Sequence, residues 1–166
     1  MVFEQWVKYL NNDTSCQWDL TKSVILSGGN GCGKSTFLKW FSILSVHGGF
    51  EFPEKKRFEY VEAQTVVDQV LTTGDLGVIP QYYTKREYYA VGLDEIGLES
   101  ECYVWKNLVY PIEQILVNRH NREKLTFCTT NLDMQDLHKK YGQRLASRIS
   151  GWNYVELIAK DYRPYL

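Results

Sequence analysis

The chain has 166 residues, a length that suits one compact domain able to bury its own core. Its formal net charge of −1 argues against a surface that attracts nucleic acid as a whole, so such a contact would need a local basic strip. Two strips are candidates, with ordinary solvated faces as the alternative: Lys55, Lys56 and Arg57, and the set Lys139, Lys140, Arg144 and Arg148.

The sequence shows no signal peptide and no apolar stretch of membrane-spanning length, so we expect no membrane partner. The four cysteines form no C-x-x-C pair, which argues against a zinc or redox motif. Reduced thiols in a cytosolic compartment are the simplest interpretation, and we therefore expect a cytoplasmic protein.

Residues 1–20 are polar and mixed, and we interpret them as a short leader before one domain at 21–166. An apolar run at 23–27 ends in glycines, which predicts a buried strand. From Ser35 the apolar residues recur at three-to-four spacing, which predicts a helix that Gly48 and Gly49 end.

Further along, residues 58–61 predict a second strand, 66–71 form a helical face, and 74–86 indicate a loop. A third strand is predicted at 88–93, followed by a helix from Trp105 to Leu116 that Pro111 should kink or interrupt. A fourth strand at 125–129, short helices at 133–142 and 144–149, and a last strand at 154–158 complete the order. This alternation predicts an α/β, three-layer sandwich whose mostly parallel sheet has helices on both faces.

The strongest motif, G-x-x-x-x-G-K-S, joins the first strand to the first helix. It consists of Gly28, Gly29, Asn30, Gly31, Cys32, Gly33, Lys34 and Ser35, and we add the adjacent Thr36 to the nucleotide-binding set. Glycines let backbone N–H groups surround phosphate oxygens, and the N-terminus of a helix favours negative charge. Lys34 can reach the β- and γ-phosphates, and the Ser35 hydroxyl can ligate Mg²⁺. The motif therefore predicts a P-loop that binds ATP with magnesium.

Two acids, Asp94 and Glu95, follow the third strand. They could simply end that strand. Together with a phosphate loop upstream, however, Asp94 is suited to hold a magnesium-bound water opposite Ser35, and Glu95 to polarise the attacking water.

A third polar group, Thr129, Thr130 and Asn131, ends the fourth strand. Asn131 can hydrogen-bond the γ-phosphate or the attacking water. The alternative is a helix N-cap, for which Asp133 competes. Ligands of parallel sheets bind at the carboxyl ends of the strands, so we expect all three motifs to meet at one edge.

A fourth feature, Arg144 and Arg148, places two arginines on one helix face. An arginine presented to the nucleotide of a neighbouring subunit can stabilise the charge of the transition state. Spacing alone favours the alternatives, a solvated basic face or a salt-bridged pair.

Several strings together resemble the AAA+ ATPases of the DnaC-type helicase loaders, a pattern that the IstB-type transposition ATPases share. They are Asp94-Glu95-Ile96-Gly97, then Arg119, then Thr129-Thr130-Asn131-Leu132, then the run from Tyr141 to Arg148. The resemblance covers about residues 22–163.

The resemblance implies the role of each matching residue. Lys34 and Ser35 would make the Walker A contacts, and Asp94 and Glu95 the Walker B pair. Asn131 would be the first sensor, Arg148 the arginine finger with Arg144 beside it, and Arg163 the second sensor. The loop departs from the family in lacking its usual proline and threonine. We also expect no separate helicase-binding domain before the first strand and no lid domain after the last.

These observations predict a small Mg²⁺-dependent ATPase that self-associates on ATP and acts in DNA replication. Its expected partners are single-stranded DNA and a replicative helicase, or a transposase if the chain is an IstB-like transposition helper. One rival is a small-molecule P-loop kinase, but the loop at 74–86 carries only Lys85 and Arg86 for an arginine-rich lid. The other rival, a binding module without hydrolysis, does not account for the intact pair of Asp94 and Glu95.

Overall fold

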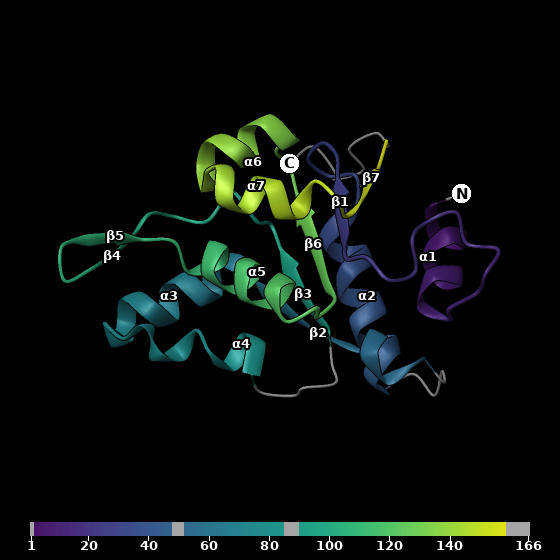
Figure 1. The fold of residues 1–166 in the computed structure, drawn as a ribbon, viewed down its shortest axis with the longest axis horizontal. Coiled ribbons are helices and arrows are strands. Elements are labelled where there is room, and N and C mark those ends of the chain that lie inside the picture. Colours follow the sequence, from purple (N-terminus) through teal and green to yellow (C-terminus); the bar gives the residue numbers. More distant parts are fainter. Residues whose placement is uncertain (1, 48–51, 85–89, 159–166) are drawn as a thin grey trace, which may run out of the picture.

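The computed structural model describes residues 2–47, 52–84 and 90–158. Its centre is a five-stranded sheet in the order β2-β3-β6-β1-β7, in which all neighbouring strands pair in parallel (Figure 1). The strands are β1 (Val24–Ser27), β2 (Phe58–Glu62), β3 (Ala90–Asp94), β6 (Thr126–Thr130) and β7 (Asn153–Glu156). The predicted α/β class is confirmed.

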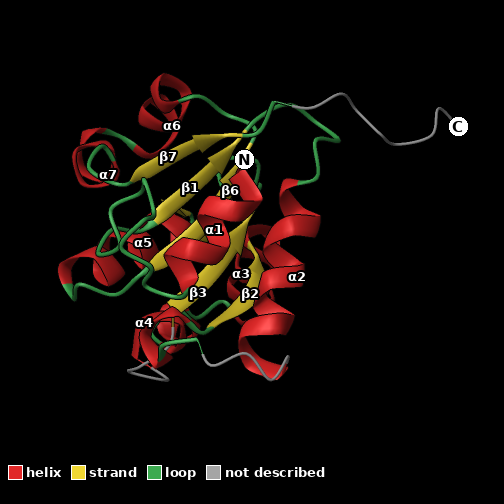
Figure 2. Cartoon of the chain, turned by 90° about the vertical axis from the view of Figure 1, so that its right-hand side faces the viewer, coloured by secondary structure: helices red, strands yellow, loops and turns green. Residues whose placement is uncertain are grey.

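Helices cover both faces of this sheet (Figure 2). On one face lie α1 (Val2–Leu10) and α2 (Lys34–His47). The other face carries α3 (Ala63–Thr73), α4 (Gln81–Thr84), α5 (Pro111–Asn121), α6 (Met134–Tyr141) and α7 (Gln143–Ile149). Side chains alternate across each strand, so Phe127 packs under α1 and α2 while Cys128 packs on the opposite face.

Helix α1 lies inside the segment that the sequence analysis assigned to a polar leader. Trp6 and Tyr9 are fully buried, and the Trp6 ring meets Phe127 of the central strand at 5.3 Å between centroids. The Tyr9 carbonyl accepts a hydrogen bond from the Lys56 ammonium at 2.5 Å, and that cation lies 3.6 Å from the centroid of the Tyr9 ring. The apolar residues at 2, 3, 6, 7, 9 and 10 recur at helical spacing, a signal that the interpretation of residues 1–20 as a polar leader overlooked.

The predicted helix from Trp105 to Leu116 is wrong in its first part. Strands β4 (Cys102–Val104) and β5 (Asn107–Val109) form a separate antiparallel hairpin instead. Trp105 and Lys106, with φ of 52° and 67°, form its two-residue turn, as in a type I′ turn. Pro111 begins α5 rather than kinking it, because its fixed φ suits the first helical position.

The five strands of the sheet and the helices α2, α3, α6 and α7 agree with the predictions apart from their ends. The predicted loop at 74–86 contains α4 and a short 3₁₀ turn, η2 (Leu76–Val78), while another such turn, η1 (Glu54–Lys56), precedes β2. Gly48, Gly49, Lys85, Arg86 and Arg163 lie outside the described residues. Among the helices described, none has both the length and the apolar character needed to cross a membrane.

Candidate functional site

The three predicted motifs meet at the carboxyl edge of the sheet. Strand β6 lies between β1 and β3, with Thr130 beside Ser27 and Cys128 beside Leu93. This register brings Thr129 next to Asp94, so the end of β6 joins the phosphate loop on one side to the acidic pair on the other. The expected convergence of the strand ends is confirmed.

The loop that follows β1 closes around Lys34. This side chain is only 5% exposed, and its ammonium donates hydrogen bonds to the carbonyls of Gly28 and Gly29, both at 2.8 Å, and contacts the Cys32 sulfur at 3.6 Å. Gly28 has φ of 143°, and a Cβ there would lie 2.5 Å from the Leu157 carbonyl oxygen. The loop therefore needs glycine at this position to pass β7.

The residues next to Lys34 lie in the first turn of α2 or at the surface of the loop. Ser35 is half-buried and Thr36 is exposed. Within the loop, Gly29, Asn30 and Gly33 are exposed. The residues predicted to bind phosphate therefore lie around the Lys34 ammonium, and several of them are exposed at the end of β1.

Asp94 is buried, and both of its carboxylate oxygens accept a hydroxyl hydrogen bond. Thr129 donates to Oδ1, and Tyr60 of β2 donates to Oδ2 at 2.6 Å. Burial, followed by the contact with Asp94, raises the pKa of Tyr60, so the phenol stays protonated as a donor. No sequence motif marks Tyr60, because only the pairing of β2 with β3 brings it to Asp94.

Glu95 is exposed and has an unusual backbone conformation. Its φ is 57°, in the left-handed region that residues other than glycine rarely occupy. Its N–H donates to the Thr129 hydroxyl at 2.8 Å, and the next N–H, of Ile96, donates to the Thr129 carbonyl at 2.9 Å. These two bonds to β6 hold the strained turn and leave the Glu95 carboxylate at the open edge.

A buried network supports this turn from behind. The Glu99 carboxylate accepts from the Gly97 N–H at 2.7 Å and from the Tyr141 hydroxyl at 2.5 Å, and the Lys140 ammonium lies 3.7 Å away. Gly97 has φ of 93°, and a Cβ there would meet the Leu132 side chain at 2.5 Å. The network ties the turn after Glu95 to α6, and the sequence analysis predicted none of it.

Asn131 follows β6 directly and is half-buried between the ends of β1 and β3. The alternative role, a helix N-cap, belongs to Asp133, whose carboxylate accepts from the Asp136 N–H at 2.8 Å. Asn131 is therefore placed at the strand edge without being needed as a cap, and its role toward a nucleotide stays a prediction.

Arg148 lies at the opposite, amino edge of the sheet. Its guanidinium donates to the Asn121 side chain at 3.2 Å and to the Arg144 carbonyl at 2.6 Å. Neither arginine is in an ion pair within the described part of the chain, so the salt-bridged alternative finds no support there. The structure does not bring Arg148 together with Lys34.

Arg119 also belongs to the residues that resemble the AAA+ family. It is buried and hydrogen-bonds groups from several elements. It donates to the Thr126 hydroxyl at 2.8 Å and to the carbonyls of Tyr82 and Leu125 at 2.9 and 2.5 Å. Burial lowers its pKa to about 10. Its contacts join α5 to α4 and β6, which indicates a structural role.

The donor set at the carboxyl edge fits magnesium bound together with phosphate. Mg²⁺ prefers oxygen ligands, keeps several waters, and commonly uses one or two protein groups plus phosphate oxygens. Asp94 and the Ser35 hydroxyl supply such a set. Within the described ranges, no cluster of three or more His, Cys, Asp or Glu side chains could hold a metal ion without phosphate.

Neither a protein-family model nor a curated protein matches the chain. Solved structures do match. The DnaC helicase loader aligns with a TM-score of 0.62 and 16% identity over 95% of this chain and 88% of that one. The chain shares its fold with this helicase loader. The resemblance stated from the sequence is thus confirmed for the fold.

Two further matches agree. AMPPCP-bound DnaA from Aquifex aeolicus aligns with a TM-score of 0.67 and 17% identity over 96% of this chain, which spans 46% of the DnaA chain. A putative primosome component from Streptococcus pyogenes serotype M3 aligns with a TM-score of 0.64 and 19% identity, covering 98% of this chain and 80% of that one. At these identities the matches establish the fold, and the chemistry has to be argued from the site.

Proposed function

We propose that the chain binds ATP with Mg²⁺ at the carboxyl edge of the sheet and hydrolyses it. The observation that carries this proposal is that the end of β6 lies between the phosphate loop after β1 and the acidic pair after β3 and bonds directly to the acidic pair. Thr129 bonds both Asp94 and the backbone of Glu95, one strand away from the loop that closes on Lys34. A DnaA structure of the same fold is bound to AMPPCP, an ATP analogue, which supports the choice of nucleotide.

In this proposal the loop amides of residues 28–33 and Thr36 hold the phosphates. Lys34 would turn from the loop carbonyls to the β- and γ-phosphates, and Ser35 and Asp94 would hold a magnesium ion, which would supply charge neutralisation of the phosphates. Glu95 accepts a hydrogen bond from the attacking water and orients it, while Asn131 donates its amide to the γ-phosphate or that water. Arg163, outside the described residues, stays a candidate second sensor.

The chain is proposed to work as an assembly of identical copies. Arg148 lies at the amino edge, so it cannot join the carboxyl-edge site of its own subunit without large rearrangement. The role proposed for it is therefore in trans, as an arginine finger on the nucleotide of an adjacent copy. Hydrolysis would then depend on self-association.

The biological setting proposed is helicase loading in DNA replication, with single-stranded DNA and a replicative helicase as partners. This rests on the shared fold, since the matched structures include a DnaC helicase loader and a DnaA bound to single-stranded DNA.

A phosphate-release assay, with and without single-stranded DNA, tests the central claim. Wild-type protein should release phosphate only with Mg²⁺ and ATP. Lys34→Ala should abolish tight ATP binding, because it removes the cation that meets the β- and γ-phosphates. Lys106→Ala on the remote hairpin is the matched control and should behave as wild type. Unchanged ATP affinity in Lys34→Ala would show that the loop does not bind the nucleotide.

A further inference from the structure

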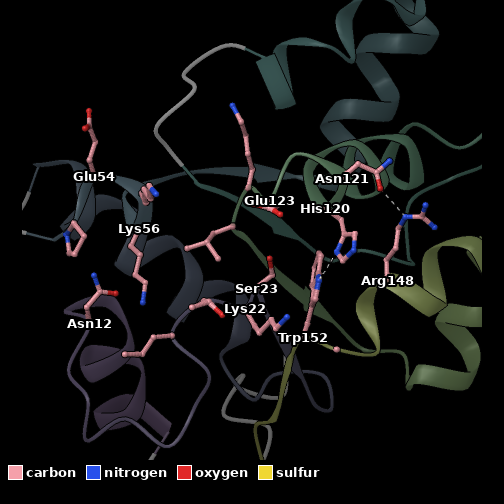
Figure 3. Close-up of a pocket in the computed structure, with 17 residues that line it drawn as sticks. Asn12, Lys22, Ser23, Glu54, Lys56, His120, Asn121, Glu123, Arg148 and Trp152 are labelled. Carbon is pink, nitrogen blue, oxygen red and sulfur yellow. Dashed lines mark hydrogen bonds between the residues drawn. The ribbon is translucent and has the colours of Figure 1, made fainter.

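A concave site lies at the amino edge of the sheet, away from the phosphate loop. It is a pocket of about 980 Å³, at the upper end of the range for ligand sites. Ser23, Leu125 and Trp152, which line it, immediately precede β1, β6 and β7. Figure 3 shows Lys22 near its centre, Lys56 on one side and Arg148 on the other.

The fold brings both candidate basic strips of the sequence to this pocket. Lys55 comes from the first strip and Arg148 from the second, and Lys22 and Lys124 join them from the segments that enter β1 and β6. With the buried Lys56, five cationic side chains line the pocket, against two carboxylates, those of Glu54 and Glu123. This excess of positive charge occurs on a chain whose net charge is −1.

Most of these cations are not held in ion pairs by described residues. In the described residues, Lys22, Lys55, Lys124 and Arg148 form no ion pair. Burial, then Arg148, then Lys22, lowers the pKa of His120, so two of these cations act on one group at this site. The nearby Asp19, whose pKa is lowered chiefly by its hydrogen bonds to Thr21, also feels the charges of Lys22 and Lys56. Lys56 differs, since its ammonium is occupied by the carbonyl and ring of Tyr9.

We infer that this pocket binds the phosphate backbone of single-stranded nucleic acid, with Lys22, Lys55 and Lys124 as the contacting cations. Cations contributed by separated segments around one concave surface suit a ligand with several phosphates better than a single anion. The inference rests on the proposed function only for the choice of DNA as the nucleic acid. Arg148, at the end of the pocket, keeps its proposed role toward the adjacent subunit.

The test compares two triple variants with the same change in charge. Lys22→Gln, Lys55→Gln and Lys124→Gln are combined in one protein, and Lys8→Gln, Lys106→Gln and Lys139→Gln, all outside the pocket lining, in the other. Fluorescence anisotropy measures binding of a labelled oligothymidine over a range of salt concentrations, with and without ATP. The pocket variant should bind at least about tenfold more weakly, and the slope of log K against log salt should become shallower by roughly 2.

The control variant should retain near wild-type binding. Equal loss in both variants would reduce the effect to overall charge and overturn the inference, as would unchanged binding in the pocket variant. If the pocket variant loses self-association in sedimentation but keeps its DNA affinity, a second copy occupies the pocket and the inference is wrong. Pocket-dependent binding of pyrophosphate to Lys34→Ala protein, without oligothymidine binding, would likewise overturn it in favour of a small phosphate ligand.

Failure of this inference can be told apart from failure of the proposed ATPase. Phosphate release without DNA, compared at concentrations where sedimentation shows equal self-association, should be the same in the pocket variant and wild type, because none of the three lysines belongs to the nucleotide site and Arg148 is unchanged. Absent hydrolysis in wild type with pocket-dependent DNA binding would remove only the ATPase. Circular dichroism of each variant confirms folding, and single Lys22→Gln, at an exposed position, provides a second measurement should the triple variant unfold.

Discussion

At the carboxyl edge of the sheet, Asp94 is buried and both of its oxygens are hydrogen-bonded, whereas at the amino edge Lys22 and Arg148 form no ion pair with a described residue. The carboxyl edge is an acidic, internally satisfied network whose one strained residue, Glu95, faces outward. The amino edge is a positively charged pocket.

The two edges therefore differ in what they can do: the carboxyl edge holds side chains in fixed orientations, and the amino edge attracts anions. Groups held by several hydrogen bonds cannot reorient cheaply, so the carboxyl edge is suited to chemistry that needs fixed geometry. An anion that binds among mutually repelling cations lowers their electrostatic free energy. The amino edge is therefore suited to binding phosphate groups of another molecule. If this difference holds, substitutions at the carboxyl edge should lower catalysis within a subunit, and substitutions at the amino edge should lower anion binding or the activity of an adjacent copy.

The largest effect is expected for Arg148→Ala, which tests whether the amino edge completes the carboxyl edge of another copy. ATP binding should persist, because Lys34 and the loop amides supply the ground-state contacts. Hydrolysis should fall by about 10³-fold or more, the range of arginine fingers. Arg148→Lys should not rescue it, since a point charge lacks the planar fork. Phosphate release and nucleotide titration measure the two quantities.

Mixing Arg148→Ala with Lys34→Ala protein provides the control for action in trans. The first keeps a nucleotide site and the second keeps an arginine, so mixed interfaces should regain hydrolysis that neither protein shows alone. If both proteins fold and associate but no mixing ratio restores activity, Arg148 acts within its own subunit or only structurally.

A slightly smaller loss is expected for Glu95→Gln at the carboxyl edge. The amide cannot accept the proton of the attacking water as a carboxylate does, so kcat should fall by about 10²- to 10⁴-fold while ATP affinity is retained. Glu101→Gln, at an exposed position beside the remote hairpin, is the matched control and should keep kcat. Wild-type turnover in Glu95→Gln would remove Glu95 from this role.

The parts that the sequence predicted are those that depend on local pattern. The phosphate loop is a contiguous motif, and the ends of parallel strands share an edge by the rules of the fold, so Lys34, Asp94 and Asn131 could be placed together beforehand. The parts it missed depend on register and packing. Tyr60 reaches Asp94 only because β2 pairs with β3, and Lys22 joins the pocket only because the ends of distant strands meet.

Local pattern also misled where two structures fit it equally. Apolar residues at 105, 108 and 112 suit a helix, yet the first two lie in the hairpin, where Trp105 is 85% exposed. Trp105 and Lys106 adopt the positive φ values of a two-residue hairpin turn. The usual sequence signal for such a turn is Asn-Gly or Asp-Gly, and neither occurs at these positions.

A moderate effect is expected for Tyr60→Phe, which removes one of the two hydroxyl donors to Asp94 without changing the packing. Outer partners of metal ligands are commonly worth about 10- to 100-fold in metal affinity or activity. The Mg²⁺ concentration for half-maximal hydrolysis should therefore rise, with KM for ATP at saturating Mg²⁺ little changed. Tyr103→Phe, on the exposed hairpin, is the control. An unchanged Mg²⁺ dependence would show that Thr129 alone orients Asp94.

The smallest effect concerns His120, which reports on the amino edge without being required for any step. Its Nδ1 accepts from the Trp152 indole at 3.4 Å, and burial together with Arg148 and Lys22 keeps its pKa below the usual value. Both cations disfavour the protonated imidazolium, so Lys22→Gln should raise the pKa of His120, and a bound oligothymidine should raise it further because phosphate favours the charged ring.

NMR titration measures the pKa of His120, with the His120 signal assigned by its loss in His120→Gln. Lys139→Gln should leave the pKa unchanged, since Lys139 is not among the groups that act on His120. If oligothymidine bound tightly yet shifted the pKa of His120 in neither direction, the DNA would lie elsewhere, and the amino edge would serve only the adjacent subunit.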